Sequence, residues 1–255
     1  MVSIIIPTYN RAAALENCLN SLKSQSFQNF EVIVVDDASK DNTKEVCDRF
    51  ANFFDLNYFL MAKCSGGPAK PRNLGVKNAK FEWVAFLDSD DTWENNKLQE
   101  VMKVLNNDDV DLVFHNFYFP TINNLEAKNI DLNNNVLKKM LFLKGNFIVN
   151  SSVVVKKNIL LYLGAFDESD RLISAEDYDL WIRISLITNK YRHINKQLGI
   201  YSYSDDSISN DFIRKMRNIN YLIYKHRKIF FKNPFYLISM VRSYFQYLIQ
   251  YFRRL

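Results

Sequence analysis

Three carboxylates come directly after an apolar run of strand length. Residues 83–87 are apolar, and Asp88, Asp90 and Asp91 follow them within four positions. Such a run is typical of a strand buried on both faces of a parallel sheet, and open α/β sheets bind ligands beyond the carboxyl ends of their strands. Acids this close together repel one another, which raises the pKa of some of them unless a cation joins them. Oxygen ligands suit a hard ion such as Mg²⁺ or Mn²⁺.

The same acids also fit a solvated turn that leads into a helix. Asp91 or Thr92 could cap a helix predicted over residues 94–105. A single acidic strand end does not distinguish this alternative from a ligand site.

Two earlier apolar runs favour a site, because they also end in polar residues. The runs cover residues 2–6 and 30–35. The first is followed by a predicted turn at Pro7, Thr8 and Tyr9, and the second by Asp36 and Asp37. Because the ends of parallel strands meet at one edge of a sheet, we expect these side chains to lie beside the acids after residue 87.

The elements that position these residues alternate between strand and helix. Predicted strands lie at 2–6, 30–35, 57–61, 83–87, 111–116, 152–155 and 198–203. Predicted helices lie at 12–24, 43–53, around 72–75, and at 94–105, 136–143 and 175–187. Residues 121–135 are a predicted loop, and residues 160–166 lead into an acidic loop at 167–171. This alternation is typical of an α/β fold with a mostly parallel sheet.

Composition narrows the class of protein. The 255 residues are 48% apolar, enough for one large α/β domain or a domain with an appendage. The formal net charge is +5, with much of the excess after Arg192 in an aromatic stretch. This pattern favours an anionic membrane surface over nucleic acid, for which no motif is present. Cys18, Cys47 and Cys64 are isolated, which fits a reducing cytoplasm, and we expect no signal peptide or spanning helix.

Five segments, in order, resemble family 2 glycosyltransferases. They are residues 3–11, 34–39, 71–75, 86–91 and 176–181. The resemblance spans roughly residues 2–210. It implies an inverting enzyme of GT-A fold, with a Rossmann-like, mostly parallel mixed sheet flanked by helices. It also implies a glycosyltransferase domain over 1–207, with a nucleotide-sugar half (1–116) and an acceptor half (117–207). A helical, amphipathic C-terminal appendage would cover 208–255.

The resemblance assigns donor-binding roles. Pro7, Thr8 and Tyr9 would line the base pocket, with Tyr9 stacked on uracil. Asp37 would accept a hydrogen bond from the uracil N3–H. Arg72 would lie near the nucleotide or diphosphate; the alternative is a surface arginine at a helix start.

The resemblance also assigns catalytic roles. Asp88, Asp90 and Asp91 are candidate ligands of Mn²⁺ or Mg²⁺. Asp88 and Asp90 are also candidate contacts to the nucleotide-sugar, and which carboxylate meets metal and which meets ribose stays open. Asp177 would be the base that deprotonates the acceptor hydroxyl, with Glu176 as the rival. The alternative is that these last acids only favour a helix N-terminus through its dipole.

One stretch departs from the family pattern. Ser202 and Ser204 stand where the family often has arginine and a histidine that can reach the metal. A histidine ligand is therefore in doubt, and we expect His115, His193 and His226 to be structural or surface residues.

The C-terminal segment predicts a partner. Apolar residues recur at helical spacing over 237–252, with basic residues largely elsewhere. Such a helix suits the cytoplasmic face of the inner membrane, where the enzyme would be peripheral, or it packs on its own domain or on a second subunit in a homodimer. On the membrane, the natural acceptor by family analogy is a polyprenyl-diphosphate-linked saccharide of O-antigen or capsule assembly.

The resulting prediction is a metal-dependent, inverting transferase that moves a hexose from a UDP-sugar and forms a β-linkage. Glucose or galactose are the first choices for the hexose, followed by N-acetylhexosamines. Two alternatives remain: a non-catalytic sugar-nucleotide-binding scaffold, and a haloacid-dehalogenase-like phosphatase. The second would use the Asp-x-Asp-x-Thr pattern at residues 88–92, but that motif normally closes the first strand of its core.

Overall fold

The computed structural model describes residues 1–120, 136–202 and 212–232, together with residues 235 and 238. Its strands are β1 (Val2–Thr8), β2 (Phe30–Asp36), β3 (Asp55–Leu60), β4 (Trp83–Phe86), β5 (Thr92–Trp93), β6 (Leu112–Tyr118), β7 (Val154–Lys156) and β8 (Tyr191–Ile200). Within these residues they form one mixed sheet in the order β3-β2-β1-β4-β7-β6-β8-β5.

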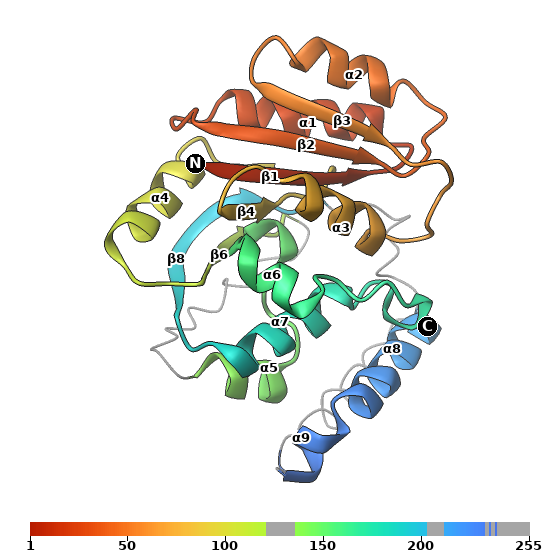
Figure 1. Cartoon of the computed structure of the whole chain (residues 1–255), viewed down its shortest axis with the longest axis vertical. Helices are drawn as coiled ribbons and strands as arrows, with labels where there is room; N and C mark the ends of the chain where they lie inside the picture. Colours follow the sequence, from red (N-terminus) through yellow and green to blue (C-terminus); the bar gives the residue numbers. More distant parts are fainter. Residues whose placement is uncertain (121–135, 203–211, 233–234, 236–237, 239–255) are drawn as a thin grey trace.

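Helices cover both faces of this sheet (Figure 1). They are α1 (Ala12–Lys23), α2 (Thr43–Phe50), α3 (Ala69–Asn78), α4 (Lys97–Asn107), α5 (Leu137–Lys144), α6 (Lys157–Leu163), α7 (Glu176–Ile187), α8 (Phe212–Lys225) and α9 (Arg227–Lys232), with short 3₁₀ turns at η1 (Asn150–Ser152) and η2 (Asp170–Leu172). In Figure 1, α8 and α9, drawn in blue, extend outward from the region of α5 to α7.

The N-terminal half of the sheet is parallel, as the apolar runs predict. β1 pairs in parallel with β2 on one side and β4 on the other, and β2 pairs in parallel with β3. Every residue of β1 and β2 is buried, because helices lie over both faces. The C-terminal half is mixed, since β7 runs antiparallel between β4 and β6.

Alternate residues of the central strands build two separate cores. Ile5 and Phe86 belong to the core that includes residues of α5 to α7, whereas Ile4 and Ile6 belong to the core with α1 and α2. Helix α3 lies close to β1, and a Cβ atom at Gly75 would overlap the side chain of Ile5. Glycine at this position therefore lets α3 approach β1. This close approach brings Arg72 near the ends of the strands.

The structure corrects three predicted elements. Residues 92–93 form β5, which pairs with β8, so the helix begins only at Lys97 and Asp91 and Thr92 do not cap it. Residues 157–163 form α6, where the apolar stretch from 160 predicts no separate helix. Strand β8 begins at Tyr191 rather than near 198, because its polar first half pairs in parallel with β6, with a register shift between Ile194 and Gln197.

The C-terminal segment is helical where the structure describes it. Helices α8 and α9 agree with the helix predicted from residue 208 onward. The interruption at 233–234 and nearly all of the amphipathic stretch at 237–252 lie outside the described residues, as does the loop at 121–135. Among the helices described, none combines the length and the apolar character needed to cross a bilayer.

Candidate active site

The ends of three parallel strands meet at one edge of the sheet, as predicted. Thr8 of β1 lies opposite Asp36 of β2, and the backbone N–H of Asp37 donates to the carbonyl of Thr8 at 2.8 Å. On the other side, the N–H of Leu87 donates to the carbonyl of Ile5 at 3.0 Å, so the acids after β4 emerge beside β1. The side chain of Arg11, just after β1, forms an ion pair with Asp90.

A buried arginine joins this edge to the start of α7. Arg72 donates from Nη2 to Oδ1 of Asp88 and from Nη1 to Oε1 of Glu176, both at 2.6 Å. Its side chain is 4% exposed, and that of Glu176 is 5% exposed. Burial alone would lower the pKa of Arg72, but the charges of Asp88 and Glu176 raise it above its ordinary value. The alternative of a surface arginine is therefore wrong.

Asp88 and Asp90 keep part of their surface open at this edge. Their side chains are 30% and 26% exposed. Besides Arg72, Asp88 accepts from Nδ2 of Asn150 at 3.1 Å. Burial and the negative charge of Asp88 raise the pKa of Asp90.

Asp91 has a different environment. It is 1% exposed, and its two carboxylate oxygens accept from the hydroxyl of Ser151 at 2.5 Å and from the N–H of Ser202 at 3.2 Å. Burial and the charge of Asp88 raise the pKa of Asp91 well above its ordinary range. Ser202, noted above as a departure from the family pattern, thus contacts this cluster through its backbone.

These carboxylates fit a divalent cation in part. Within the described ranges, no group of three or more His, Cys, Asp or Glu side chains is arranged to hold a metal ion. Burial raises the pKa values of Asp90 and Asp91, and the like charge of Asp88 raises them further, a repulsion that a cation would relieve. The partly exposed oxygens of Asp88 and Asp90 fit a hard ion such as Mg²⁺ or Mn²⁺. In this arrangement Asp91 does not, because both of its oxygens are already hydrogen-bonded.

The residues predicted to bind the base differ in accessibility. Pro7 and Thr8 are buried within β1 rather than in a turn, because the ladder to β2 continues through Thr8 and Asp36. Tyr9 follows the strand and is 44% exposed. Asp37 is buried and accepts from the N–H and the hydroxyl of Ser65, at 2.8 and 2.9 Å. Asp37 therefore holds the loop before α3 in place, whatever else it binds.

Asp177 lies in the first turn of α7, as predicted. Its carboxylate accepts from Nδ2 of Asn146 at 3.0 Å and from the N–H of Tyr178 at 2.7 Å. The protein atoms packed around Asp177 and the negative charge of Glu176 raise its pKa to about 7. A carboxylate that titrates near neutral pH has the proton affinity that a general base needs.

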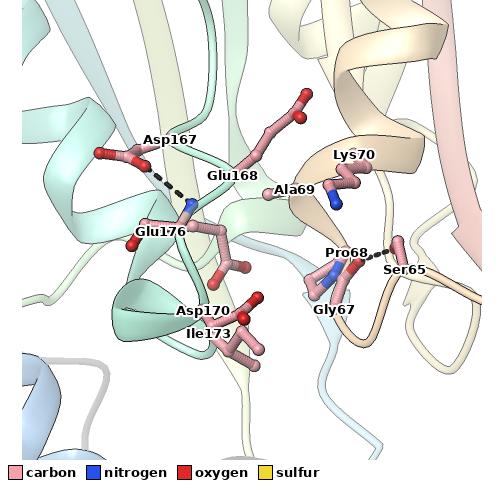
Figure 2. A pocket seen from close by; sticks show the side chains of 11 residues that line it. Ser65, Gly67, Pro68, Ala69, Lys70, Asp167, Glu168, Asp170, Ile173 and Glu176 are labelled. Atoms are coloured by element: carbon pink, nitrogen blue, oxygen red, sulfur yellow. Dashed lines mark hydrogen bonds between the residues drawn. The ribbon is translucent and has the colours of Figure 1, made fainter.

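A pocket lies between the loop before α3 and the segment that leads into α7. In Figure 2, Pro68 and Lys70 lie on one wall, and Asp170, Ile173 and Glu176 lie on the other. The remaining lining residues are Ser65, Gly67, Ala69, Asp167, Glu168 and Ser169. The second carboxylate oxygen of Glu176, Oε2, is buried and has no hydrogen-bond partner among the residues that the structure describes. The pocket is thus bounded by acids that can accept hydrogen bonds from a hydroxyl-rich ligand.

Comparison with known proteins identifies the family. The sequence model described as "Glycosyl transferase family 2" matches residues 3–160. The chain belongs to glycosyl transferase family 2. Membership removes the phosphatase alternative, whose motif would use the same Asp88 and Asp90.

Other glycosyltransferases are similar to this chain in sequence or in fold. The chain is 34% identical to the glycosyltransferase GlyG of Streptococcus pneumoniae over 118 residues, covering 46% of this chain and 39% of GlyG. Staphylococcus aureus TarS 1–349, solved in complex with UDP-GlcNAc, matches with a TM-score of 0.68 and 24% identity, covering 82% of this chain and 60% of TarS 1–349. The mannosyltransferase PcManGT of Pyrobaculum calidifontis, solved with GDP-Man and Mn²⁺, matches with a TM-score of 0.68 and 19% identity, covering 95% and 73%.

These likenesses support the GT-A fold for the family 2 chain. The described sheet is mixed and mostly parallel with helices on both faces, and the TM-score of 0.68 to TarS 1–349 agrees with a shared fold. The chain spans 39% and 60% of the lengths of the first two curated relatives that it matches, so their whole-protein activities are not carried over.

Sequence reasoning missed several residues of this family 2 site. Asn146, Asn150 and Ser151 all contact its carboxylates, although none belongs to a predicted motif. They lie between α5 and β7, and the signal that could have indicated them is a group of polar residues beside the apolar residues 153–155. Arg11 was part of a motif but had no assigned role, and its partner Asp90 is 79 residues away.

Proposed function

We propose that this chain transfers a hexose from a UDP-sugar to a hydroxyl of a saccharide acceptor, with inversion at the anomeric carbon. The carrying observation is the pair of bonds from Arg72, which joins the strand-end acid Asp88 to Glu176, the neighbour of Asp177. This link places candidate donor-binding acids and a candidate base on one connected framework. We assign the donor to a half over residues 1–116 and the acceptor to a half over 117–207.

The donor contacts follow from exposure and chemistry. The aromatic ring of Tyr9 is partly exposed, and uracil can stack on it beside Pro7 and Thr8. Asp37 has acceptor capacity beyond its bonds to Ser65, and a carboxylate there would favour the N3–H of uracil. The similarity to TarS, which was solved with UDP-GlcNAc, supports UDP as the nucleotide of the donor.

Asp88 and Asp90 are the proposed ligands of a divalent cation, with Arg72 and Arg11 as their partners in its absence. Asp91 would join them only after giving up a hydrogen bond to Ser151 or Ser202. A bound Mn²⁺ or Mg²⁺ would offset the negative charge that grows on UDP as the bond to the sugar breaks.

Asp177 is the proposed base. Its carboxylate would take the proton of the acceptor hydroxyl as that oxygen attacks C1 from the face opposite UDP. One such displacement inverts the configuration, so an α-linked UDP-sugar gives a β-glycoside. Asn146 holds the carboxylate in place during this step, and its N–H₂ group stabilises the ionised form.

The sugar is proposed from a relative of this chain, and the acceptor from analogy with the family. Glucose, galactose and N-acetylhexosamines are the donors to compare. UDP-GlcNAc is tested first, because the chain is 45% identical over 91 residues to TarS, which is named a poly(ribitol-phosphate) β-N-acetylglucosaminyltransferase. The proposed acceptor is a polyprenyl-diphosphate-linked saccharide of O-antigen or capsule assembly.

A membrane-facing surface on the C-terminal helices would suit this acceptor. Among the residues described there, Phe231, Phe235 and Ile238 are strongly exposed apolar side chains. Basic residues lie close to them in sequence, at Arg227, Lys228 and Lys232. We propose peripheral binding to anionic lipid at the cytoplasmic face of the inner membrane. Sedimentation with phosphatidylglycerol vesicles but not phosphatidylcholine vesicles supports this; a concentration-dependent dimer with no vesicle binding contradicts it.

The decisive test of function is UDP release across a panel of UDP-hexoses. It is measured with Mn²⁺, Mg²⁺ or chelator, and with or without a synthetic GlcNAc- or GalNAc-diphosphate-lipid. Release from one donor that requires metal and rises with acceptor supports the proposal. UDP binding without release in any condition favours a non-catalytic scaffold.

Asp177→Asn should abolish transfer while UDP binding persists. Asp48→Asn, on the exposed face of α2, is the matched control and should transfer normally. Transfer by Asp177→Asn at the wild-type rate would show that the base lies elsewhere, with Glu176 the next residue to substitute.

A further inference from the structure

The segment between α6 and α7 has a strained backbone at both ends. Ala165 has a φ of 53° and Ser174 a φ of 73°, in the left-handed region that non-glycine residues seldom adopt. Ser174 lies two residues before Glu176 and three before Asp177. Such conformations persist only where the surrounding structure enforces them. The contacts that hold residues 165–175 therefore also determine where α7 begins.

Helix α3 holds the first end of this segment. The amide group of Asn73 donates to the carbonyl of Phe166 at 2.8 Å and accepts from the N–H of Phe166 at 2.9 Å. It also donates to Glu168 at 2.9 Å. Asn73 belongs to one of the motifs that resemble the family, so this anchor lies inside the matched residues 3–160.

Helix α8 holds the second end. The Nδ2 group of Asn218, which is 2% exposed, donates to the carbonyl of Ile173 at 2.6 Å. That carbonyl directly precedes the strained Ser174. Arg217 also donates to the carbonyl of Asp170 at 3.0 Å. Since Asp170 and Ile173 line the pocket of Figure 2, these bonds tie α8 to that wall of the pocket.

The end of α8 is itself fixed to α7 through Asp179, two residues after the proposed base. Asp179 is fully buried and accepts from His226 at 2.9 Å and from Lys225 at 2.8 Å on one oxygen, and from Arg183 at 2.7 Å on the other. Burial alone would raise the pKa of Asp179, but the bond from His226 and the charges of Arg183 and Lys225 lower it. Lys225 also donates to Asp167 on the pocket wall at 2.7 Å.

We propose that Asn218 and His226 are positioning residues, which hold the segment over 165–175 and the first turn of α7 so that Asp177 meets the acceptor hydroxyl. Both lie outside the residues that match the family, so the inference concerns this chain's own C-terminal helices. It rests on the proposed function of Asp177.

Hydrogen–deuterium exchange of the full-length chain tests the positioning without any substrate. Asn218→Ala removes the donor to Ile173 and should speed exchange of peptides over 166–177 about fivefold, the effect of one lost hydrogen bond. Asn220→Ala is the matched control, because Asn220 is exposed on the same helix. It should leave those peptides unchanged. Equal exchange in the two variants contradicts the inference.

Kinetics separate positioning from a general loss of stability. With the donor and acceptor found active for the wild type, Asn218→Ala should lower kcat about 10- to 100-fold while the donor KM stays within about twofold. His226→Ala should behave similarly, and His226→Gln, which keeps an N–H donor for Asp179, should recover most of kcat. Wild-type kcat in both Ala variants overturns the inference, as does a loss that His226→Gln fails to recover.

The two proposals fail in different ways. A wild-type chain without transfer contradicts the proposed function, and the exchange measurement then decides alone whether α8 holds the segment. Normal transfer by the wild type and by every variant contradicts only the positioning.

Discussion

Replacement of Arg72 by methionine removes the cation that joins Asp88 to Glu176. Methionine has the unbranched shape of the apolar part of arginine and suits this buried site, where the guanidinium carbon of Arg72 lies 5.2 Å from the ring centre of Phe166. The change leaves Glu176 buried without its partner and removes one partner of Asp88. Breaking a buried ion pair from one side costs about 3–5 kcal/mol. We expect a loss of that size in the free energy of unfolding of Arg72→Met.

A second substitution tests the origin of the loss. Glu176→Gln removes the charge left behind, so the double variant Arg72→Met/Glu176→Gln should recover about 1–3 kcal/mol relative to Arg72→Met. Arg49→Met is the matched control, because Arg49 pairs with Glu16 at 2.9 Å on the surface, where it is 54% exposed. It should cost less than about 1 kcal/mol.

Urea unfolding at pH 7 measures these differences, with tryptophan fluorescence as the signal, since Trp93 and Trp181 are both buried. At acid pH, the difference in the free energy of unfolding between Arg72→Met and the wild type should become smaller, because protonation of the unpaired carboxylates removes their charge. A cost for Arg72→Met no larger than that for Arg49→Met would refute the reasoning. So would a double variant no more stable than Arg72→Met, since the loss would then come from packing alone.

Four other predictions follow from Asp177, Asn146 and Gly75. Because only ionised Asp177 can accept a proton and its pKa is about 7, kcat should fall about tenfold for each pH unit below that value; a flat acid limb in a pH–rate profile contradicts this. The same raised pKa means that the folded chain holds this proton more tightly than the unfolded one, so its contribution to stability declines as pH rises from about 4 to about 7. Asn146→Ala removes a donor that lowers this pKa, and the acid limb should move up by about 0.5–1 unit. Gly75→Ala should destabilise the chain by about 1–3 kcal/mol in thermal unfolding, despite alanine's helix preference, because its Cβ overlaps Ile5.

The donor-side edge was predictable because its signals are local. A buried parallel strand is mostly apolar, and the runs before Thr8, Asp36 and Asp88 are each of this kind, although the first two include one polar residue, Ser3 and Glu31. Parallel pairing then brings their ends together, whatever the details of the helices between them. The family 2 motifs agree with this because they occupy those strand ends.

Elements that depend on distant partners were not predictable in the same way. Strand β5 has only two residues and exists because β8 pairs with it more than 100 residues later. Helix α6 is a short helix between a strand and the strained Ala165, so its seven residues carry too little periodicity to stand out. The bonds of Asp91 to Ser151 and Ser202 likewise join residues that no local pattern connects.

The ion pairs of Arg72 are better explained by the geometry that they fix than by the stability that they add. Arg72 and Glu176 are 104 residues apart, and the motif around each is complete without the other. Replacing a buried ion pair with well-packed apolar residues is often neutral or stabilising, so stability gives little reason for this pair to be charged. What the charges provide is a fixed distance between the end of β4 and the start of α7. The reaction proposed above, which brings a departing UDP and an acceptor base to opposite sides of one carbon, needs that distance held, and apolar packing would specify it less closely.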